Sequence, residues 1–169
     1  MQRIFARLKR ISLFWKIVLV VVVFGAANEF YENHKISTAV SQYKEVLSRT
    51  CKIAEPGLND IYIALNSPGD NYVTVLQKVG AAEDELLSAE RILRIGTSEI
   101  DGSKFSIETF RLKDNEWFLR TTIESSLNDS MDIAIAQGDP ESIASGRAAD
   151  GVKLVADRLE TVKEICEKY

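Results

Sequence analysis

The sequence is poor in proline and glycine, which favour loops, and in cysteine and histidine, which bind metal ions. Three prolines and nine glycines in 169 residues argue against a loop-rich or collagen-like chain. Two cysteines are too few for a disulfide scaffold or a four-cysteine zinc site, and a single histidine excludes a multi-histidine metal site. With 46% apolar and 27% charged residues, the composition is that of one ordinary globular domain.

Signatures of catalysis and of cofactor binding are also missing. The sequence contains neither a glycine-rich phosphate loop nor a dinucleotide-binding glycine motif. His34 is accompanied by no serine in a nucleophile-elbow pattern. Asp129 and Asp132 lack the glycine and the closing glutamate of a calcium loop. We therefore expect no enzyme, no cofactor and no metal site, and a hydrolase with an unidentified site is the alternative.

Negative charge is absent from the first 28 residues, which contain five basic residues. These are Arg3, Arg7, Lys9, Arg10 and Lys16. Without them, 16 basic side chains stand against 25 acidic ones, so residues 17–169 carry a net charge of −9. Because an acidic body is a poor electrostatic match for phosphates, we expect no nucleic-acid partner.

The apolar run behind this basic segment predicts a membrane anchor. Residues 17–27 carry no polar side chain, and residues 13–31 supply nineteen mostly apolar residues, close to the about 20 that a spanning helix needs. Positive charge stays on the cytoplasmic side. We thus expect a signal-anchor helix, with residues 1–12 in the cytoplasm and residues 32–169 outside it, in a bacterial periplasm or an equivalent compartment. The residues expected at the membrane interfaces are Arg7, Arg10, Trp15, Lys16 and Tyr31.

Two other destinations fit the same N-terminus. The eleven apolar residues also match the core of a secretory signal, and Gly25 and Ala27 are suitable small residues for a cut after Ala27. That cut would give a secreted helical domain. An arginine-rich, acid-free start also fits mitochondrial targeting, with an anchor in the mitochondrial inner membrane.

Apolar residues at helical spacing predict an all-α body. Helices are expected over residues 28–54, ended by Pro56 and Gly57, then over 58–65, 71–95, 124–136 and from Asp139 to the C-terminus. Each helix must bury an apolar seam against the others, so we expect an antiparallel helical bundle. The clearest seams are Ile36, Val40, Tyr43, Leu47 and Thr50, and Ala148, Val152, Val155, Leu159, Val162 and Cys166.

Residues 104–123 are ambiguous. Aromatic and β-branched residues on either side of Lys113-Asp114-Asn115-Glu116 suggest a small β-hairpin. A helix from Ile107 onward, capped by Ser106, is the alternative. We favour the helix, because an isolated hairpin among helices is only marginally stable.

The two cysteines are far apart in sequence, near the ends of two expected helices. In an oxidising compartment we expect a disulfide between Cys51 and Cys166, with two unpaired buried thiols as the alternative. The bridge would bring two C-terminal helix ends together, so these helices should run parallel.

The densest aromatic cluster contains Phe105, Phe110, Trp117 and Phe118. Burial in the core is the default expectation for such residues, and exposure of Phe110, Trp117 and Phe118 to a protein partner is the alternative. The sequence as a whole favours a membrane-anchored interaction or accessory subunit of a membrane-associated complex. A small-ligand sensor domain that signals through a partner is the other candidate. The seams fit a monomer and a dimer equally well, so the oligomeric state stays open.

Overall fold

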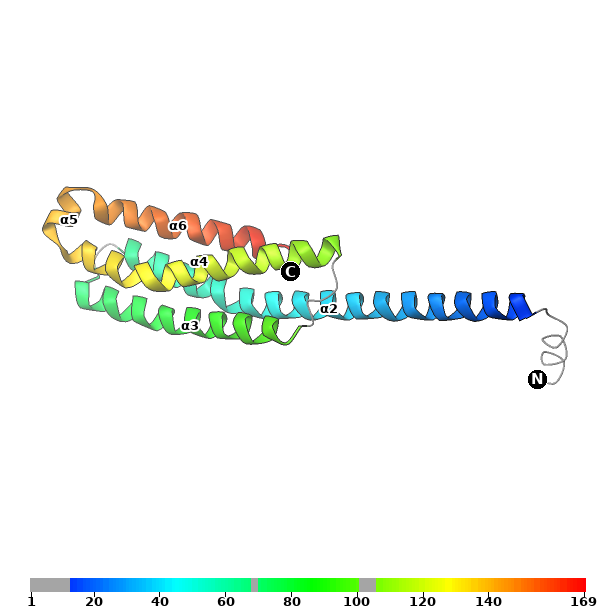
Figure 1. Cartoon of the computed structure of the whole chain (residues 1–169). Helices are drawn as coiled ribbons and strands as arrows, with labels where there is room; N and C mark the ends of the chain where they lie inside the picture. Colours follow the sequence, from blue (N-terminus) through cyan, green and yellow to red (C-terminus); the bar gives the residue numbers. More distant parts are fainter. Residues whose placement is uncertain (1–12, 68–69, 101–105) are drawn as a thin grey trace. The chain divides into compact units, whose positions relative to one another are not determined.

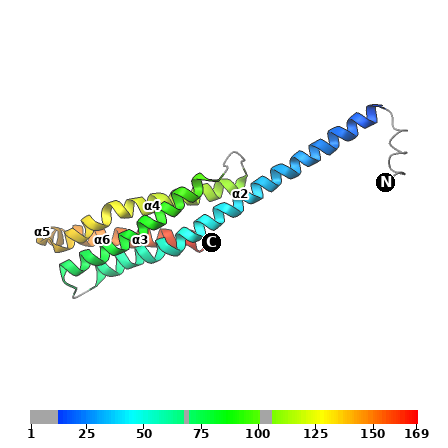
Figure 2. The same cartoon turned by 90° about the horizontal axis from the view of Figure 1, so that it is seen from below.

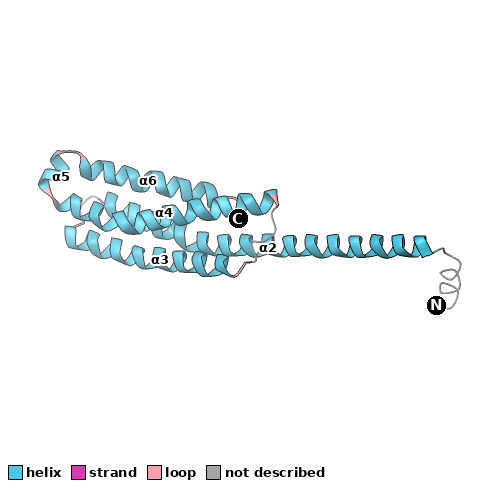
Figure 3. Cartoon of the chain, in the orientation of Figure 1, coloured by secondary structure: helices cyan, strands magenta, loops and turns pink. Residues whose placement is uncertain are grey.

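The computed structural model describes residues 13–67, 70–100 and 106–169, and it contains no strand in these ranges (Figure 3). Their contacts divide the chain after Thr38, and each of the two units is described separately. The helices are α2 (Leu13–Asn66), α3 (Tyr72–Ser98), α4 (Ile107–Gly138), α5 (Pro140–Ala144) and α6 (Arg147–Cys166).

The first unit contains the start of α2. The large apolar side chains at Ile17 and from Leu19 to Phe24 are exposed, as are Phe30 and Tyr31. No helix formed by the described residues combines the length and the apolar character needed to cross a membrane. The membrane span over residues 13–31 therefore stays a prediction.

The second unit is the expected helical bundle. Residues 39–66 of α2 and helix α4 run in one direction, and α3 and α6 run in the other (Figures 1 and 2). Helices α2, α3, α4 and α6 each bury side chains spaced three or four residues apart, which is the period of one helix face. The largest fully buried apolar side chains are Leu47, Leu58, Ile61, Val79, Leu86, Leu93, Leu119, Ile123, Val155 and Val162.

The expected end of the first helix at Pro56 is wrong, because α2 continues through Pro56 to Asn66. A proline inside a helix costs about 3 kcal/mol. Pro56 is exposed, whereas Leu58 and Ile61 beyond it are completely buried. Burying each such side chain contributes about 1.5–3 kcal/mol, so the two together outweigh the proline.

The helix favoured from Ile107 onward is confirmed, and the alternative hairpin over residues 104–123 is wrong where the structure describes it, since α4 is a single helix of 32 residues. Its start is held by a capping box. The Thr109 N–H donates to Ser106 Oγ (3.0 Å), and the Ser106 N–H donates to Thr109 Oγ1 (2.8 Å). Leu112, Leu119 and Ile123 then follow one buried face. Residues 104 and 105 lie outside the described residues.

Two of the expected helix starts are confirmed. Asn71 Oδ1 accepts a hydrogen bond from the Thr74 N–H (2.9 Å) at the start of α3. Asp139 caps α5 in the same way. The expected last helix is nevertheless divided, because Gly146 has a φ of 82° and separates α5 from α6. Positive φ is strained for other residues, so glycine suits this break.

The disulfide between Cys51 and Cys166 is confirmed, with the two Cα atoms 5.5 Å apart. The expected parallel direction of the two helices is wrong. It rested on a helix that ended near Cys51, but α2 continues to Asn66 and α6 runs antiparallel to it. The bridge therefore joins the middle of α2 to the end of α6.

Two glycines of α3 provide a matched test of helix packing. A Cβ atom added to Gly96 would lie 2.6 Å from Val46 Cγ2, whereas one added to Gly80 would meet nothing closer than Met131 Cε at 3.8 Å. We expect Gly96→Ala to destabilise the protein by about 1–3 kcal/mol through overpacking. Gly80→Ala should instead stabilise it by about 0.5–1 kcal/mol through helix propensity. Urea unfolding of both variants checks this, and equal shifts would contradict the close approach of α3 to α2.

The cap at Asp139 predicts a pH dependence. The Ser142 hydroxyl (2.6 Å) and then the Ser142 N–H (2.9 Å) donate to Asp139 Oδ2 and hold the pKa of this carboxyl below its ordinary value of 3.8. The cap therefore stabilises the fold above that pH, and this contribution is lost as the pH falls through the lowered pKa. Asp139→Asn keeps a cap that does not titrate. Thermal midpoints between about pH 5 and pH 2 should fall less steeply in the variant than in the wild type; parallel curves would refute this role.

Candidate functional site

Four large apolar side chains share the outer face of α4. Ile107 is 78% exposed, Phe110 57%, Trp117 58% and Phe118 47%. At 100° per residue these positions fall on one side of the helix. The opposite side carries Thr109, Leu112, Leu119 and Ile123, which are buried against the bundle. We call the four exposed residues the α4 face.

The default expectation that the aromatic cluster lies in the core is thus wrong for Phe110, Trp117 and Phe118. The Trp117 and Phe118 rings contact each other edge to face, with centroids 4.9 Å apart and an interplanar angle of 77°. Such a pair contributes about 0.5–1.5 kcal/mol beyond the area that it buries. Phe105 lies outside the described residues.

Charged residues border the α4 face, and the exposed Asp114 lies within it, between Phe110 and Trp117. Glu108 pairs with Lys44 of α2 (2.6 Å), which connects the first turn of α4 to the bundle. Asp114 and Arg111 are exposed, and neither makes an ion pair with another described residue. Because both partners of this exposed ion pair are solvated, the Lys44–Glu108 contact adds little stability and mainly positions the helix.

A hollow of about 490 Å³ lies beside Trp117, between α2, α3 and α4. Its lining includes three cationic side chains and one acidic one: Arg94, Lys113, Arg120 and Glu116. The guanidinium of Arg120 pairs with Glu116 and donates from Nη2 to Thr97 Oγ1 (3.3 Å). Arg120 Nε is buried and has no hydrogen-bond partner among the described residues.

Tyr43 also lines this hollow from α2. Its ring is buried, and its hydroxyl makes no hydrogen bond with another described residue. Burial, and then the negative charge of Glu116, raise the pKa of the Tyr43 phenol above 10.0, whereas Arg120 acts in the opposite direction. The phenol therefore stays protonated at neutral pH and is available as a donor.

Of the two aspartates considered for a calcium loop, Asp129 has a structural partner. Asp129 accepts a hydrogen bond from Arg158 Nη2 (2.5 Å), and Arg158 Nη1 donates to the Ser125 carbonyl (3.0 Å), so this group joins α6 to α4. Within the described ranges no cluster of three metal-ligating side chains occurs. His34 lies in the first unit, where its carbonyl accepts from the Thr38 hydroxyl.

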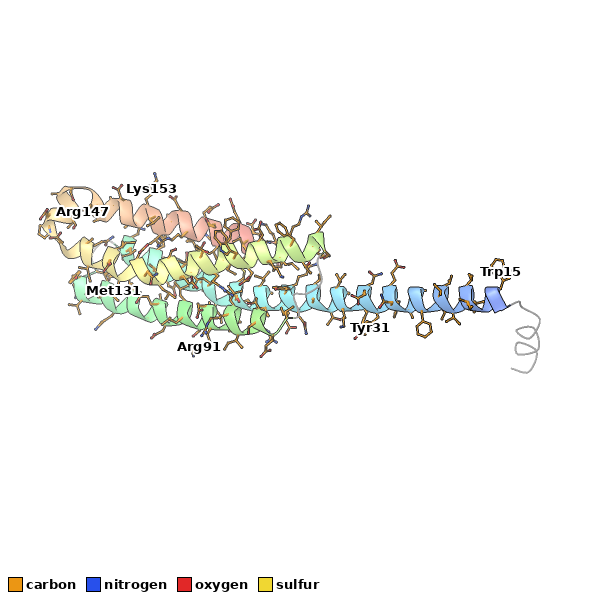
Figure 4. All side chains as sticks on the ribbon, viewed as in Figure 1. Trp15, Tyr31, Arg91, Met131, Arg147 and Lys153 are labelled. Atoms are coloured by element: carbon orange, nitrogen blue, oxygen red, sulfur yellow. A yellow bond between two sulfur atoms is a disulfide. The ribbon has the colours of Figure 1, made fainter. Side chains whose placement is uncertain are left out.

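The predicted membrane-interface residues are placed only in part. Trp15 and Tyr31 project from α2 and are exposed (Figure 4). Lys35 Nζ lies 4.6 Å from the centroid of the Tyr31 ring, in a cation–π contact. Arg7 and Arg10 lie outside the described residues, and Lys16 lies in the first turns of α2.

Sequence reasoning named Phe110, Trp117 and Phe118 but missed the hollow. Its lining comes from three helices, and no short motif connects Tyr43, Arg94 and Arg120. The one available signal was Tyr43, a residue with a polar group placed in an otherwise apolar seam. Comparison of the chain with protein-family models, curated proteins and solved structures finds no match.

Proposed function

We propose that this protein is a membrane-anchored interaction subunit, tethered by residues 13–31 and docking onto another protein of the same membrane through the α4 face. The observation that carries the proposal is the exposure of Ile107, Phe110, Trp117 and Phe118 on one helix side. Aromatic residues concentrate in the centres of protein interfaces.

The tether is supported by the first unit taken by itself. Leu19 to Phe24 are consecutive residues of a helix and are all exposed, so apolar groups point outward in every direction. A helix that is apolar all round requires an apolar environment. A span over residues 13–31 would place Lys16 and Glu29 near its ends, where charged groups reach the headgroups.

The disulfide supports an extracytoplasmic position for the bundle. Stable disulfides form in the periplasm, in the secretory pathway and in comparable oxidising spaces. With basic residues ahead of the span, we propose a cytoplasmic N-terminus and a bundle in a bacterial periplasm or an equivalent compartment. A mitochondrial inner-membrane anchor and a domain secreted after cleavage at Ala27 are the alternatives.

Membrane fractionation tests the tether. We expect the full-length protein to resist carbonate extraction, and Val21→Arg combined with Val22→Arg to release it, because each central arginine costs about 2.5–3.5 kcal/mol. Val73→Arg combined with Leu154→Arg is the control, since both side chains are exposed on the bundle. Release of the wild type, or an intact mass that lacks residues 1–27, would refute the anchor.

Docking is tested by photo-crosslinking in the native membrane. A photoreactive residue at position 118 should give one discrete adduct with a different membrane protein, and Phe110→Ala with Trp117→Ala should abolish it. The same probe at exposed Leu154 of α6 is the control. An equal adduct from position 154, adducts with a second copy of the chain alone, or no adduct at all would refute docking through the α4 face.

A ligand-sensing role is the second candidate, and the hollow beside Trp117 is the observation that favours it. The bundle has no output domain among the described residues, so a signal would have to pass through the docked partner.

A further inference from the structure

We propose that the partner of the α4 face supplies a helix with one lysine or arginine in the middle of its apolar side, and that this cation pairs with Asp114. The inference rests on the proposed docking role and adds the chemistry of the partner to it.

Asp114 lies in the middle of the α4 face. Phe110 and Phe118 are four residues before and after it, and Ile107 and Trp117 are seven residues before and three residues after it. These spacings place the four apolar side chains around Asp114 on one side of the helix. All five side chains are exposed, so a molecule that covers the apolar ones also covers the carboxylate.

The Asp114 carboxylate has no counter-ion within the part of the chain that the structure describes. Arg111 is three residues earlier on the same side of α4, and it makes no ion pair with Asp114 or with another described residue. An exposed carboxylate of this kind is solvated by water. A docked partner displaces that water and has to replace its interactions.

The free energy of burial determines what the partner must carry. Burying an unpaired carboxylate costs far more than burying a neutral polar group. A lysine or arginine opposite Asp114 offsets this cost through a charge-assisted hydrogen bond. Residues 17–169 carry a net charge of −9, which also attracts a cationic surface. A partner with a purely apolar surface is therefore disfavoured, so Asp114 contributes to specificity.

The shape of the α4 face indicates that a helix brings the cation. From Ile107 to Phe118 the face follows the axis of α4 for about 17 Å, at 1.5 Å per residue. Side chains three and four residues apart form ridges that pack into the grooves of a second helix. The partner segment is therefore expected to carry its lysine or arginine between apolar residues three or four positions to either side.

Neutralisation of Asp114 tests the pairing by the sign of its effect. The probe is the photoreactive residue at position 118 of the full-length chain in its native membrane, and the readout is the yield of the partner adduct. Asp114→Asn keeps the shape of the side chain and should lower this yield at least about tenfold, because the partner's cation loses its counter-ion. A partner without the cation would give a higher yield instead, since no unpaired charge would then be buried.

Asp132→Asn is the matched control. Asp132 is also exposed, and it lies on the same side of α4 but five turns away from Asp114. Its neutralisation should leave the adduct unchanged. Arg111→Gln should have a smaller effect than Asp114→Asn, whereas an equal loss would identify Arg111 as the counter-ion. Unchanged far-ultraviolet circular dichroism verifies that each variant is folded.

The sequence of the crosslinked peptide completes the test. Mass spectrometry of the wild-type adduct should locate a partner segment with the expected lysine or arginine, and its exchange for aspartate should restore the adduct that Asp114→Lys loses. An unchanged or higher yield in Asp114→Asn, a segment without this cation, or no restoration by the exchange would overturn the pairing and leave docking intact. Absence of an adduct from the wild type would refute docking and, with it, this inference.

Discussion

Replacement of both Cys51 and Cys166 by alanine is expected to lower the free energy of unfolding by up to about 4.7 kcal/mol, the chain-entropy value for a loop of roughly 100 residues. The bridge joins positions 115 residues apart and closes most of the bundle's chain into one loop. Its removal therefore gives the unfolded chain more conformational entropy, which favours unfolding. For a domain whose total stability is about 5–15 kcal/mol, this is a large fraction.

Urea unfolding with and without reductant measures the effect. The oxidised wild type should unfold at a higher urea concentration than the reduced wild type, and the double variant should be insensitive to reductant. Cys51 is buried and Cys166 is half-buried, so a small additional loss from packing is expected in the variant. Identical wild-type midpoints in both conditions would show that the bridge does not stabilise the fold.

Pro56→Ala is expected to act in the opposite direction and to stabilise the protein by about 2 kcal/mol. Proline in a helix interior costs about 3 kcal/mol relative to alanine, and its restriction of the unfolded chain returns at most about 1 kcal/mol of this. Pro56 is exposed, so the substitution removes no core contact. It also supplies an N–H that can donate to the carbonyl four residues earlier, at Lys52.

Asp60→Ala is the control for this substitution, since Asp60 is exposed on the same helix. We expect it to change stability by less than about 0.5 kcal/mol. If Pro56→Ala is neutral or destabilising, the bundle requires a bend in α2 at this point, because a proline bend would then direct Leu58 and Ile61 into the core.

Features that are determined by neighbouring residues could be predicted from the sequence, whereas features that depend on distant parts of the chain could not. Caps are local, and Asn71, Ser106 and Asp139 are identifiable from their own neighbours. The seam from Val155 to Val162 is also readable, because its period spans only two turns. The end of α2 cannot be predicted from the local sequence, since the favourable burial of Leu58 and Ile61 depends on helices elsewhere in the chain.

The candidate site shows the same division. Phe110, Trp117 and Phe118 are conspicuous in the sequence, but their exposure is decided by the neighbours of α4, which occupy its other side. The pairing of Cys51 with Cys166 follows from there being two cysteines, whereas the relative direction of their helices does not. The convergence of Tyr43, Arg94 and Arg120 is a purely tertiary property.

The position of the disulfide has a mechanical consequence. A force applied between the N-terminus and Tyr169 would pass along α2 to Cys51, across the sulfur atoms to Cys166, and out through the last three residues. The force would then bypass α3, α4, α5 and nearly all of α6. These helices could not be pulled out while the disulfide is intact. Under tension the oxidised bundle would extend only by what precedes Cys51 and follows Cys166, and the α4 face would carry none of the load.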